Sequence, residues 1–246
     1  MTFRVWIQKV PHIFEDGKWP LGPGREAMNK FVTLSAVVAV SSCCLPAGAS
    51  VVYEDSTGDL FDNSMSHLDI TSATVSHDAA NVNILVEFAG SISDTDWGNY
   101  IIAFDAYEGG TDSNAWNRNI DFGDTQIDRF IGSWVNSGGG IDGHHHFNGW
   151  YGNNDGLSIT LSDTGIMYTI SREWLGNDVD SFGFDVMSSG TSGDNPGVDH
   201  LSQSASATDG WGSGSTSGTF LTYNLPAPGA LALLGIAGLA RSRRRR

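Results

Sequence analysis

The sequence predicts an all-β fold, a single antiparallel β-sandwich of the jelly-roll or immunoglobulin-like type, over residues 50–224. Short apolar runs alternate there with clusters of Gly, Asp, Asn and Ser, which is the spacing expected of a sandwich or a barrel. No segment carries the 3.6-residue apolar period of an amphipathic helix over three turns, which argues against an α/β fold. The 175 residues of this stretch are enough for one hydrophobic core.

The individual strands are predicted from their apolar period. Residues 68–75 form the first, and after a turn at 78–80 residues 82–88 form its hairpin partner, because every second residue from Val82 to Phe88 is large and apolar. The more continuous apolar run at 100–106 indicates a central strand. Five further strands are predicted at 127–135, 157–161, 166–170, 182–187 and 220–223, with one helical turn at 172–175 and a Ser/Gly-rich mobile loop at 202–218. We expect 8–10 strands in all.

The N-terminal region predicts export. Residues 28–49 have the parts of a secretory signal helix: a positive start at Met28–Lys30, an apolar segment at Phe31–Val40 and the small-residue cleavage site Ala47-Gly48-Ala49. Residues 1–27 do not fit such a signal, so we interpret them as an upstream start-site extension. A second possibility is a lipoprotein-type cleavage that would leave a lipidated Cys43 at the new N-terminus.

The C-terminal region, residues 225–246, predicts a sorting tail. A short proline motif precedes a 12-residue apolar run, Gly229–Ala240, which is shorter than the roughly 20 residues of a spanning helix and therefore indicates a short hydrophobic helix in transient membrane contact. Basic residues after the run stay on the cytoplasmic side. The residues that carry this pattern are Pro226, Ala227, Pro228, Arg243, Arg244, Arg245 and Arg246.

This layout resembles the PEP-CTERM sorting signal of exported bacterial proteins. The resemblance implies cleavage by an exosortase-type membrane protease after passage through the secretion machinery. It also implies delivery to the cell surface or extracellular matrix of a Gram-negative-type bacterium. Ala227 stands where the family motif has glutamate, which leaves open whether the tail is cleaved. The alternative is a simple tail anchor that is never cut.

The net charge of the chain restricts the classes of molecule that it can bind. The whole chain has a formal net charge of -15, but between residues 50 and 224 only three arginines face 25 acidic residues, a net charge of −22. Such a domain repels nucleic acid and anionic lipid and favours cations or neutral partners, although solubility in salt is a sufficient reason for the acidity. Both cysteines, Cys43 and Cys44, precede the expected cleavage after Ala49, which leaves neither a disulfide scaffold nor a thiol enzyme.

The segments Asp55–Asp59, Thr95–Tyr100, Asn114–Arg118 and Ile131–Trp134 together resemble those of CBM9-like and DOMON-like β-sandwiches. The resemblance spans residues 50–224. It implies a sandwich that binds sugars, sometimes with calcium, and it implies no catalytic residues.

A calcium site is predicted at Asp55, Asp59 and Asp62, which lie in one glycine-containing loop. Calcium takes six to eight oxygen ligands in flexible geometry, and carboxylates on a turning loop supply them. The spacing does not match an EF-hand, and a solvated acidic loop is the alternative.

A sugar-binding site is predicted at Trp97, Trp116 and Trp150 with Arg118. Indole faces stack on the apolar face of a pyranose, while polar neighbours hydrogen-bond its hydroxyl groups. Whether these three indoles are exposed or fill the core stays open. Two other tryptophans, Trp134 and Trp174, are assigned to the core.

Consecutive histidines at 144–146 are typical of Zn²⁺ or Cu²⁺ sites, but in a strand at most two share a face, so we interpret this stretch as a polar loop. No nucleophile-elbow, Walker or dinucleotide motif is present. The sequence therefore predicts an exported, non-catalytic protein that binds extracellular polysaccharide. The first alternative is a structural, calcium-stabilised matrix protein without a discrete ligand. The second alternative is a secreted glycoside hydrolase.

Overall fold

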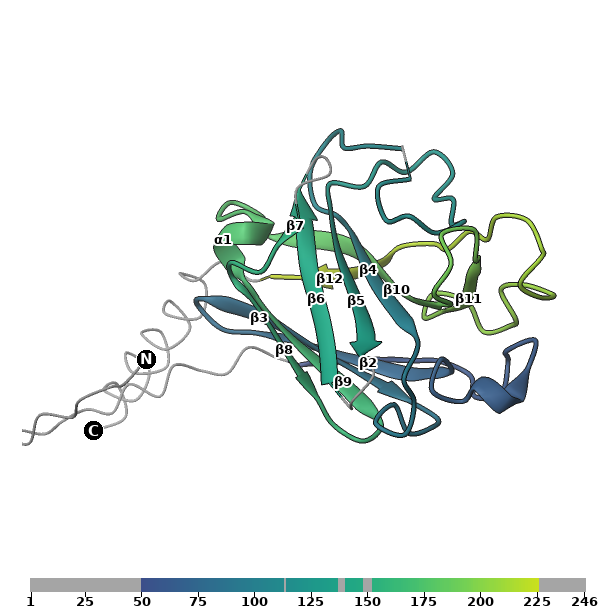
Figure 1. Cartoon of the computed structure of the whole chain (residues 1–246). Coiled ribbons are helices and arrows are strands. Elements are labelled where there is room, and N and C mark those ends of the chain that lie inside the picture. Colours follow the sequence, from purple (N-terminus) through teal and green to yellow (C-terminus); the bar gives the residue numbers. More distant parts are fainter. Residues whose placement is uncertain (1–49, 113, 137–139, 148–151, 226–246) are drawn as a thin grey trace, which may run out of the picture. The chain divides into compact units, whose positions relative to one another are not determined.

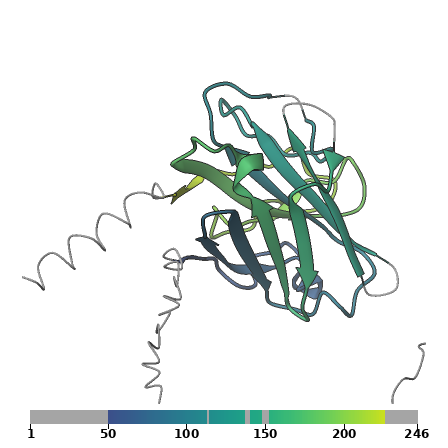
Figure 2. The same ribbon diagram turned by 90° about the vertical axis from the view of Figure 1, so that its left-hand side faces the viewer.

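Alternating apolar residues build two antiparallel sheets whose inner faces pack together (Figure 1, and turned by 90° in Figure 2). The computed structural model describes residues 50–112, 114–136, 140–147 and 152–225. The predicted upstream extension, the predicted signal peptide, Trp150 and the predicted sorting tail after Leu225 lie outside the described residues, whereas Leu225 itself is buried in the core. No helix among the described residues is long and apolar enough to span a membrane.

The first sheet has five strands, in the spatial order β1 (Val51–Glu54), β2 (Ile70–His77), β3 (Asn81–Phe88), β9 (Gly165–Ser171) and β8 (Leu157–Leu161). The second sheet has seven, in the order β11 (Gly197–His200), β10 (Ser181–Ser189), β4 (Asn99–Asp105), β5 (Arg129–Asn136), β6 (Gly140–Phe147) and β7 (Gly152–Asn153), with β12 (Leu221–Asn224) also paired to β10. All these pairings are antiparallel.

The core between the sheets follows from the two-residue period of the strands. Ile84 of β3 and Tyr168 of β9 are paired neighbours on the first sheet, and Phe104 of β4 and Phe184 of β10 are paired on the second. All four are fully buried in one apolar cluster. Since burying a large apolar side chain contributes about 1.5–3 kcal/mol, this cluster holds the two sheets together.

Strand β4 is apolar on both faces because both faces are covered. Ile102 faces the other sheet, whereas Ile101 and Ala103 face outward and belong to a second apolar cluster. The covering residues of that cluster come from the excursion between β4 and β5, the teal loop at the top of Figure 1. The predicted central position of this strand is confirmed, since β4 lies between β10 and β5.

The all-β fold and its two packed antiparallel sheets are confirmed, while the choice between jelly-roll and immunoglobulin-like connections stays a prediction. The helical turn is confirmed as α1 (Arg172–Leu175), whose N-terminus is capped by the Ser171 hydroxyl, which accepts from the Trp174 amide at 3.1 Å. The described residues form twelve strands, more than expected. The additional strands are β1, β6, β7 and β11, and the polar loop predicted around His144–His146 is wrong because these residues lie in β6.

Candidate functional site

Four aspartates from separate parts of the chain converge at one end of the sandwich. Asp55 follows β1, Asp59 lies in the loop before the short 3-10 turn Asn63–Met65, Asp69 directly precedes β2, and Asp199 lies in β11. One carboxylate oxygen from each of Asp59, Asp69 and Asp199 lies within 4.8 Å of the other two. These three aspartates could hold a metal ion, and Asp55 lies close enough to repel their carboxylates. We call the four residues Asp55, Asp59, Asp69 and Asp199 the aspartate cluster.

Backbone amides fix two members of the cluster. The Asp199 carboxylate accepts from the Ile70 amide at 2.6 Å and from the His200 amide at 2.9 Å, and Asp69 accepts from the Gly58 amide at 2.8 Å. These bonds tie β11 to the start of β2 and the loop after β1 to β2. The second oxygen of Asp69, both oxygens of Asp59 and one of Asp55 are buried without a hydrogen-bond partner among the described residues. Buried oxygens of this kind are available as ligands to a cation.

Burial and mutual repulsion also shift the pKa values of the clustered aspartates. Burial is the main reason that the pKa of Asp55 rises to about 8, and the neighbouring carboxylates Asp59 and Asp69 raise it further. Burial likewise raises the pKa of Asp199 to about 8, with added repulsion from the other three members. A carboxylate that is desolvated among like charges is destabilised when ionised, and a bound cation would reverse that penalty.

The predicted calcium residues are thus only partly brought together. Of the three predicted residues, only Asp59 belongs to the group whose oxygens converge. Asp55 lies beside that group and is repelled by it, whereas Asp62 points elsewhere. The Asp62 carboxylate accepts from the Ser64 amide at 2.9 Å and caps the 3-10 turn, which lowers its pKa. The two missed members are Asp69, which follows the same loop directly before β2, and Asp199, which is far away in sequence and joins the cluster through strand pairing.

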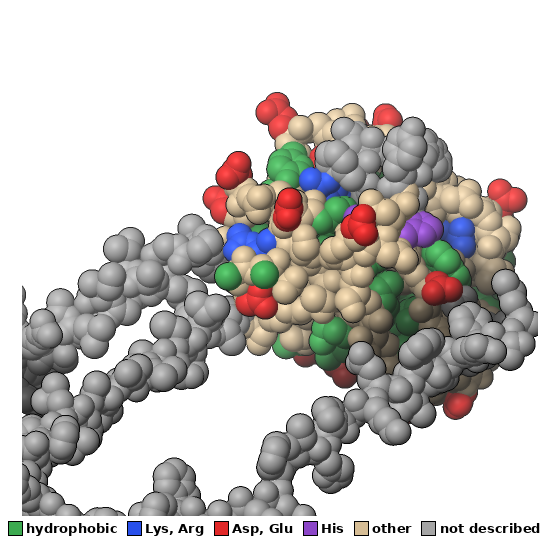
Figure 3. Space-filling model, turned by 60° about the vertical axis from the view of Figure 1, so that its left-hand side comes forward, with side chains coloured by type: hydrophobic (Ala, Val, Ile, Leu, Met, Phe, Trp, Pro, Cys, Tyr) green, Lys and Arg blue, Asp and Glu red, His purple; other side chains and the backbone are tan. Residues whose placement is uncertain are grey.

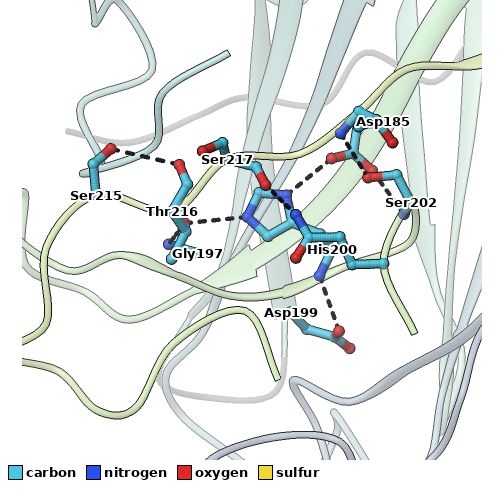
Figure 4. Close-up of polar contacts among 10 residues, drawn as sticks. Asp185, Gly197, Asp199, His200, Ser202, Ser215, Thr216 and Ser217 are labelled. Atoms are coloured by element: carbon cyan, nitrogen blue, oxygen red, sulfur yellow. Dashed lines mark hydrogen bonds and ion pairs between the residues drawn. The ribbon is translucent and has the colours of Figure 1, made fainter. Parts of the chain in front are cut away.

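A buried histidine–aspartate pair lies next to the cluster. The imidazole Nδ1 of His200 lies 2.9 Å from the Asp185 carboxylate, and its Nε2 lies 3.2 Å from the Thr216 hydroxyl (Figure 4). Although this row resembles a catalytic triad in its order, Asp185 and His200 are fully buried and Thr216 is 4% exposed, so a substrate cannot reach it. The row instead anchors the 202–218 loop, which is irregular as predicted, to β10 and β11.

A cavity of about 390 Å³ lies on the outer face of the seven-stranded sheet. Its floor comes from β4, β5 and β6, and its wall from the β4–β5 excursion. We call it the outer-face cavity, and its polar and aromatic lining includes Asn99, Trp116, Asn117, Arg118, Trp134 and His144. None of the described residues that line it is Asp or Glu, although acidic side chains are spread over the molecular face drawn in Figure 3.

Local geometry places the wall residues. Asn117 has a positive φ of 52°, a left-handed turn that asparagine tolerates better than most residues, and it directs Trp116 and Arg118 on either side of it toward the cavity. The Trp116 indole donates to the Ile120 carbonyl at 3.0 Å and packs edge-on against Phe122. It is 6% exposed, so this indole is a buried wall and not an open stacking platform.

The structure therefore separates the predicted sugar-binding residues. Trp116 and Arg118 share the outer-face cavity, whereas Trp97 is half-buried elsewhere, in edge contact with His67 and Trp211. Trp134 was assigned to the core, and this prediction is wrong: it is half-buried on the outer face of β5, in edge contact with His144. Trp174 does pack against the core as predicted.

The histidine run divides between two faces. His144 lines the outer-face cavity, while His145 is buried against Trp174, as alternation in a strand requires. The imidazoles of His144 and His145 therefore lie on opposite faces of β6.

No protein-family model matches the chain, and no curated protein matches it either.

Proposed function

We propose that this is an exported, non-catalytic protein that binds extracellular polysaccharide through the outer-face cavity. The observation that carries the proposal is the composition of that cavity. Two indoles, Trp116 and Trp134, are combined there with the side chains of Asn99, Asn117 and Arg118. Aromatic surface with a few convergent polar groups is the usual composition of a small-molecule site, and about 390 Å³ lies within the range of such pockets.

The export part of the proposal rests on the sequence patterns at the two ends. A signal peptide at 28–49 and a PEP-CTERM-like tail at 225–246 would deliver the domain to the cell surface or the extracellular matrix, with an exosortase-type protease as a processing partner. Mass spectrometry of the exported protein tests this directly. An N-terminus at Ser50 supports the predicted cleavage, while an acylated Cys43 would replace it by lipidation.

We propose that the ion suited to the aspartate cluster is Ca²⁺. All the convergent ligand atoms are carboxylate oxygens, and hard oxygen ligands in an irregular arrangement favour Ca²⁺ over transition metals. Because the cluster connects the loop after β1, the start of β2, and β11, the ion would have a structural role. This observation also favours the second candidate function, a calcium-stabilised matrix protein without a discrete ligand.

A glycoside hydrolase is the least supported function. Its acid–base pair must face a substrate across a cleft. The carboxyls with raised pKa include Asp199, which is 2% exposed and accepts from two backbone amides. The Asp185–His200–Thr216 row is also buried.

Binding of the purified full chain to a panel of soluble and insoluble polysaccharides, with calcium and with chelator, tests the proposal. We expect selective retention that is lost in Trp134→Ala and kept in Trp97→Ala, because only the first indole lines the cavity. Failure of every polysaccharide to retain the protein would contradict sugar binding and leave the structural alternative.

A further inference from the structure

We infer that the outer-face cavity takes a sugar that carries a carboxylate, a uronic acid, and that Arg118 binds this carboxylate. The inference rests on the proposed function and deepens it by naming the class of sugar. It starts from the charge of one buried side chain.

Arg118 is a buried cation without a buried anion. It is 8% exposed, and no carboxylate lies within 4.0 Å of it among the described residues. Its side chain donates to neutral groups only, from Nε to the Gly190 carbonyl at 2.9 Å and from Nη1 to the Asn117 carbonyl. Burial lowers its pKa, and no neighbouring charge opposes this effect. Proteins pair buried charges or hold them for a ligand.

The lining of the cavity indicates that the Arg118 charge is held for a ligand. A domain with 25 acidic residues and three arginines places one of the three in a cavity whose described lining has no carboxylate. Arg129 and Arg172 are equally buried, but neither is among the residues that line this cavity, and the Arg129 guanidinium lies 5.4 Å from the ring centres of both Tyr107 and Trp174. The counter-charge that Arg118 lacks is therefore most simply supplied by the ligand.

The chemistry of the guanidinium specifies the anion. Its planar fork matches the two oxygens of a carboxylate, and such charge-assisted hydrogen bonds are stronger than neutral ones. The half-buried indole of Trp134 suits the ring of the same sugar, the amides of Asn99 and Asn117 suit its hydroxyl groups, and the buried Trp116 closes the wall beside them. A sulfated sugar presents the same sign of charge without that planar match, so it forms one arm of the test.

Long-range charge limits the size of the ligand. The net charge of −22 repels a polyanion, but at physiological salt this repulsion is screened beyond about 8 Å. A short oligosaccharide with one carboxylate receives the local attraction of Arg118 and little of the global repulsion. We therefore choose disaccharides as probes rather than polyuronates.

The test is calorimetric titration of the full chain, at constant calcium, with disaccharides that end in glucuronate, galacturonate or mannuronate. Each is compared with its neutral parent, its methyl ester and a sulfated analogue. We expect at least one acid to bind about ten-fold or more tightly than its neutral parent and its ester. Arg118→Gln should remove that preference, and Arg118→Lys should weaken it.

The outcomes separate this inference from the function on which it rests. Equal binding of acids and neutral parents would overturn the inference and leave polysaccharide binding intact. A preference that survives in Arg118→Gln, or tighter binding of the sulfated analogue, would also overturn it. Failure of every disaccharide and of every polysaccharide would overturn both. Thermal unfolding of both variants checks that they fold. If Arg118→Gln does not fold, the weaker preference expected of Arg118→Lys still tests the inference.

Discussion

The aspartate cluster and the outer-face cavity are both buried charge imbalances, but of opposite sign. In the first, carboxylates crowd together and several of their oxygens have no hydrogen-bond partner among the described residues. In the second, one guanidinium is buried where none of the described lining residues is acidic. The Asp185–His200 pair lies between these extremes, because its two groups satisfy each other at 2.9 Å. On our proposals the two unpaired regions bind ligands, whereas the paired one stabilises the fold.

The largest effect is expected where a satisfied buried pair is broken. His200→Leu would leave Asp185 buried without its main partner and should lower the free energy of unfolding by about 3–5 kcal/mol. Denaturant unfolding measures it. Asp185→Asn combined with His200→Leu should recover part of the loss, because the double variant buries no lone carboxylate. If His200→Leu lowers the free energy of unfolding by less than about 1 kcal/mol, the Asp185–His200 pair does not have the stabilising role assigned to it.

The next effect is expected from the cation at the aspartate cluster. Calcium at about a hundred times its dissociation constant should stabilise the fold by about 2.7 kcal/mol, which raises the melting temperature by roughly 5–10 °C. Calorimetry with calcium and with chelator measures the shift. Asp69→Asn should abolish it, whereas the matched control Asp62→Asn should keep it, since Asp62 lies outside the cluster. Equal melting temperatures with calcium and chelator would contradict the site.

The aspartate cluster should also make the melting temperature depend on pH. Asp55 and Asp199 have a folded-state pKa of about 8, above the value of about 4 in an unfolded chain. The folded protein therefore holds protons that the unfolded chain has lost, so their stabilising contribution is full below about pH 4 and is lost as the pH rises to about 8. In chelator, the melting temperature should fall across this window, and calcium should oppose the fall. A melting temperature in chelator that rises with pH would contradict this sign.

The smallest effect on stability is expected at Arg118. Because its charge is uncompensated, Arg118→Gln should change the free energy of unfolding by less than about 1 kcal/mol while it alters binding. Thermal unfolding without sugar measures it. A loss as large as that of His200→Leu would mean that Arg118 is a structural residue, and the two regions would no longer differ.

The sequence predicts the strands better than the sites. Every second residue of β3 is large and apolar, so its inner face is readable directly. β6 was missed because the run Gly140-Ile-Asp-Gly-His-His-His-Phe147 combines turn residues with polar ones, and only pairing along β5 makes it a strand. Neighbouring residues such as Asp55 and Asp59 could be grouped from their spacing.

The remaining site residues depend on tertiary structure. Asp199 reaches the aspartate cluster because β11 pairs with β10, and no local pattern encodes that pairing. The prediction that Trp134 fills the core is wrong because the alternation Ile131, Ser133, Val135 directs this indole to the opposite face of β5. This alternation is the signal in the sequence from which the outward position of Trp134 could be predicted.

We propose that the sugar binds in the outer-face cavity and not beside the contacting indoles of Trp97 and Trp211. Titration of the full chain with the uronyl disaccharides, followed by the indole N–H signals of its eight tryptophans in NMR spectra, tests it most directly. Signals are assigned from single Trp→Phe variants. We predict that Trp134 and Trp116 shift with the sugar while Trp97 and Trp211 do not. Shifts confined to Trp97 and Trp211, or no shift of any indole, would contradict the claim.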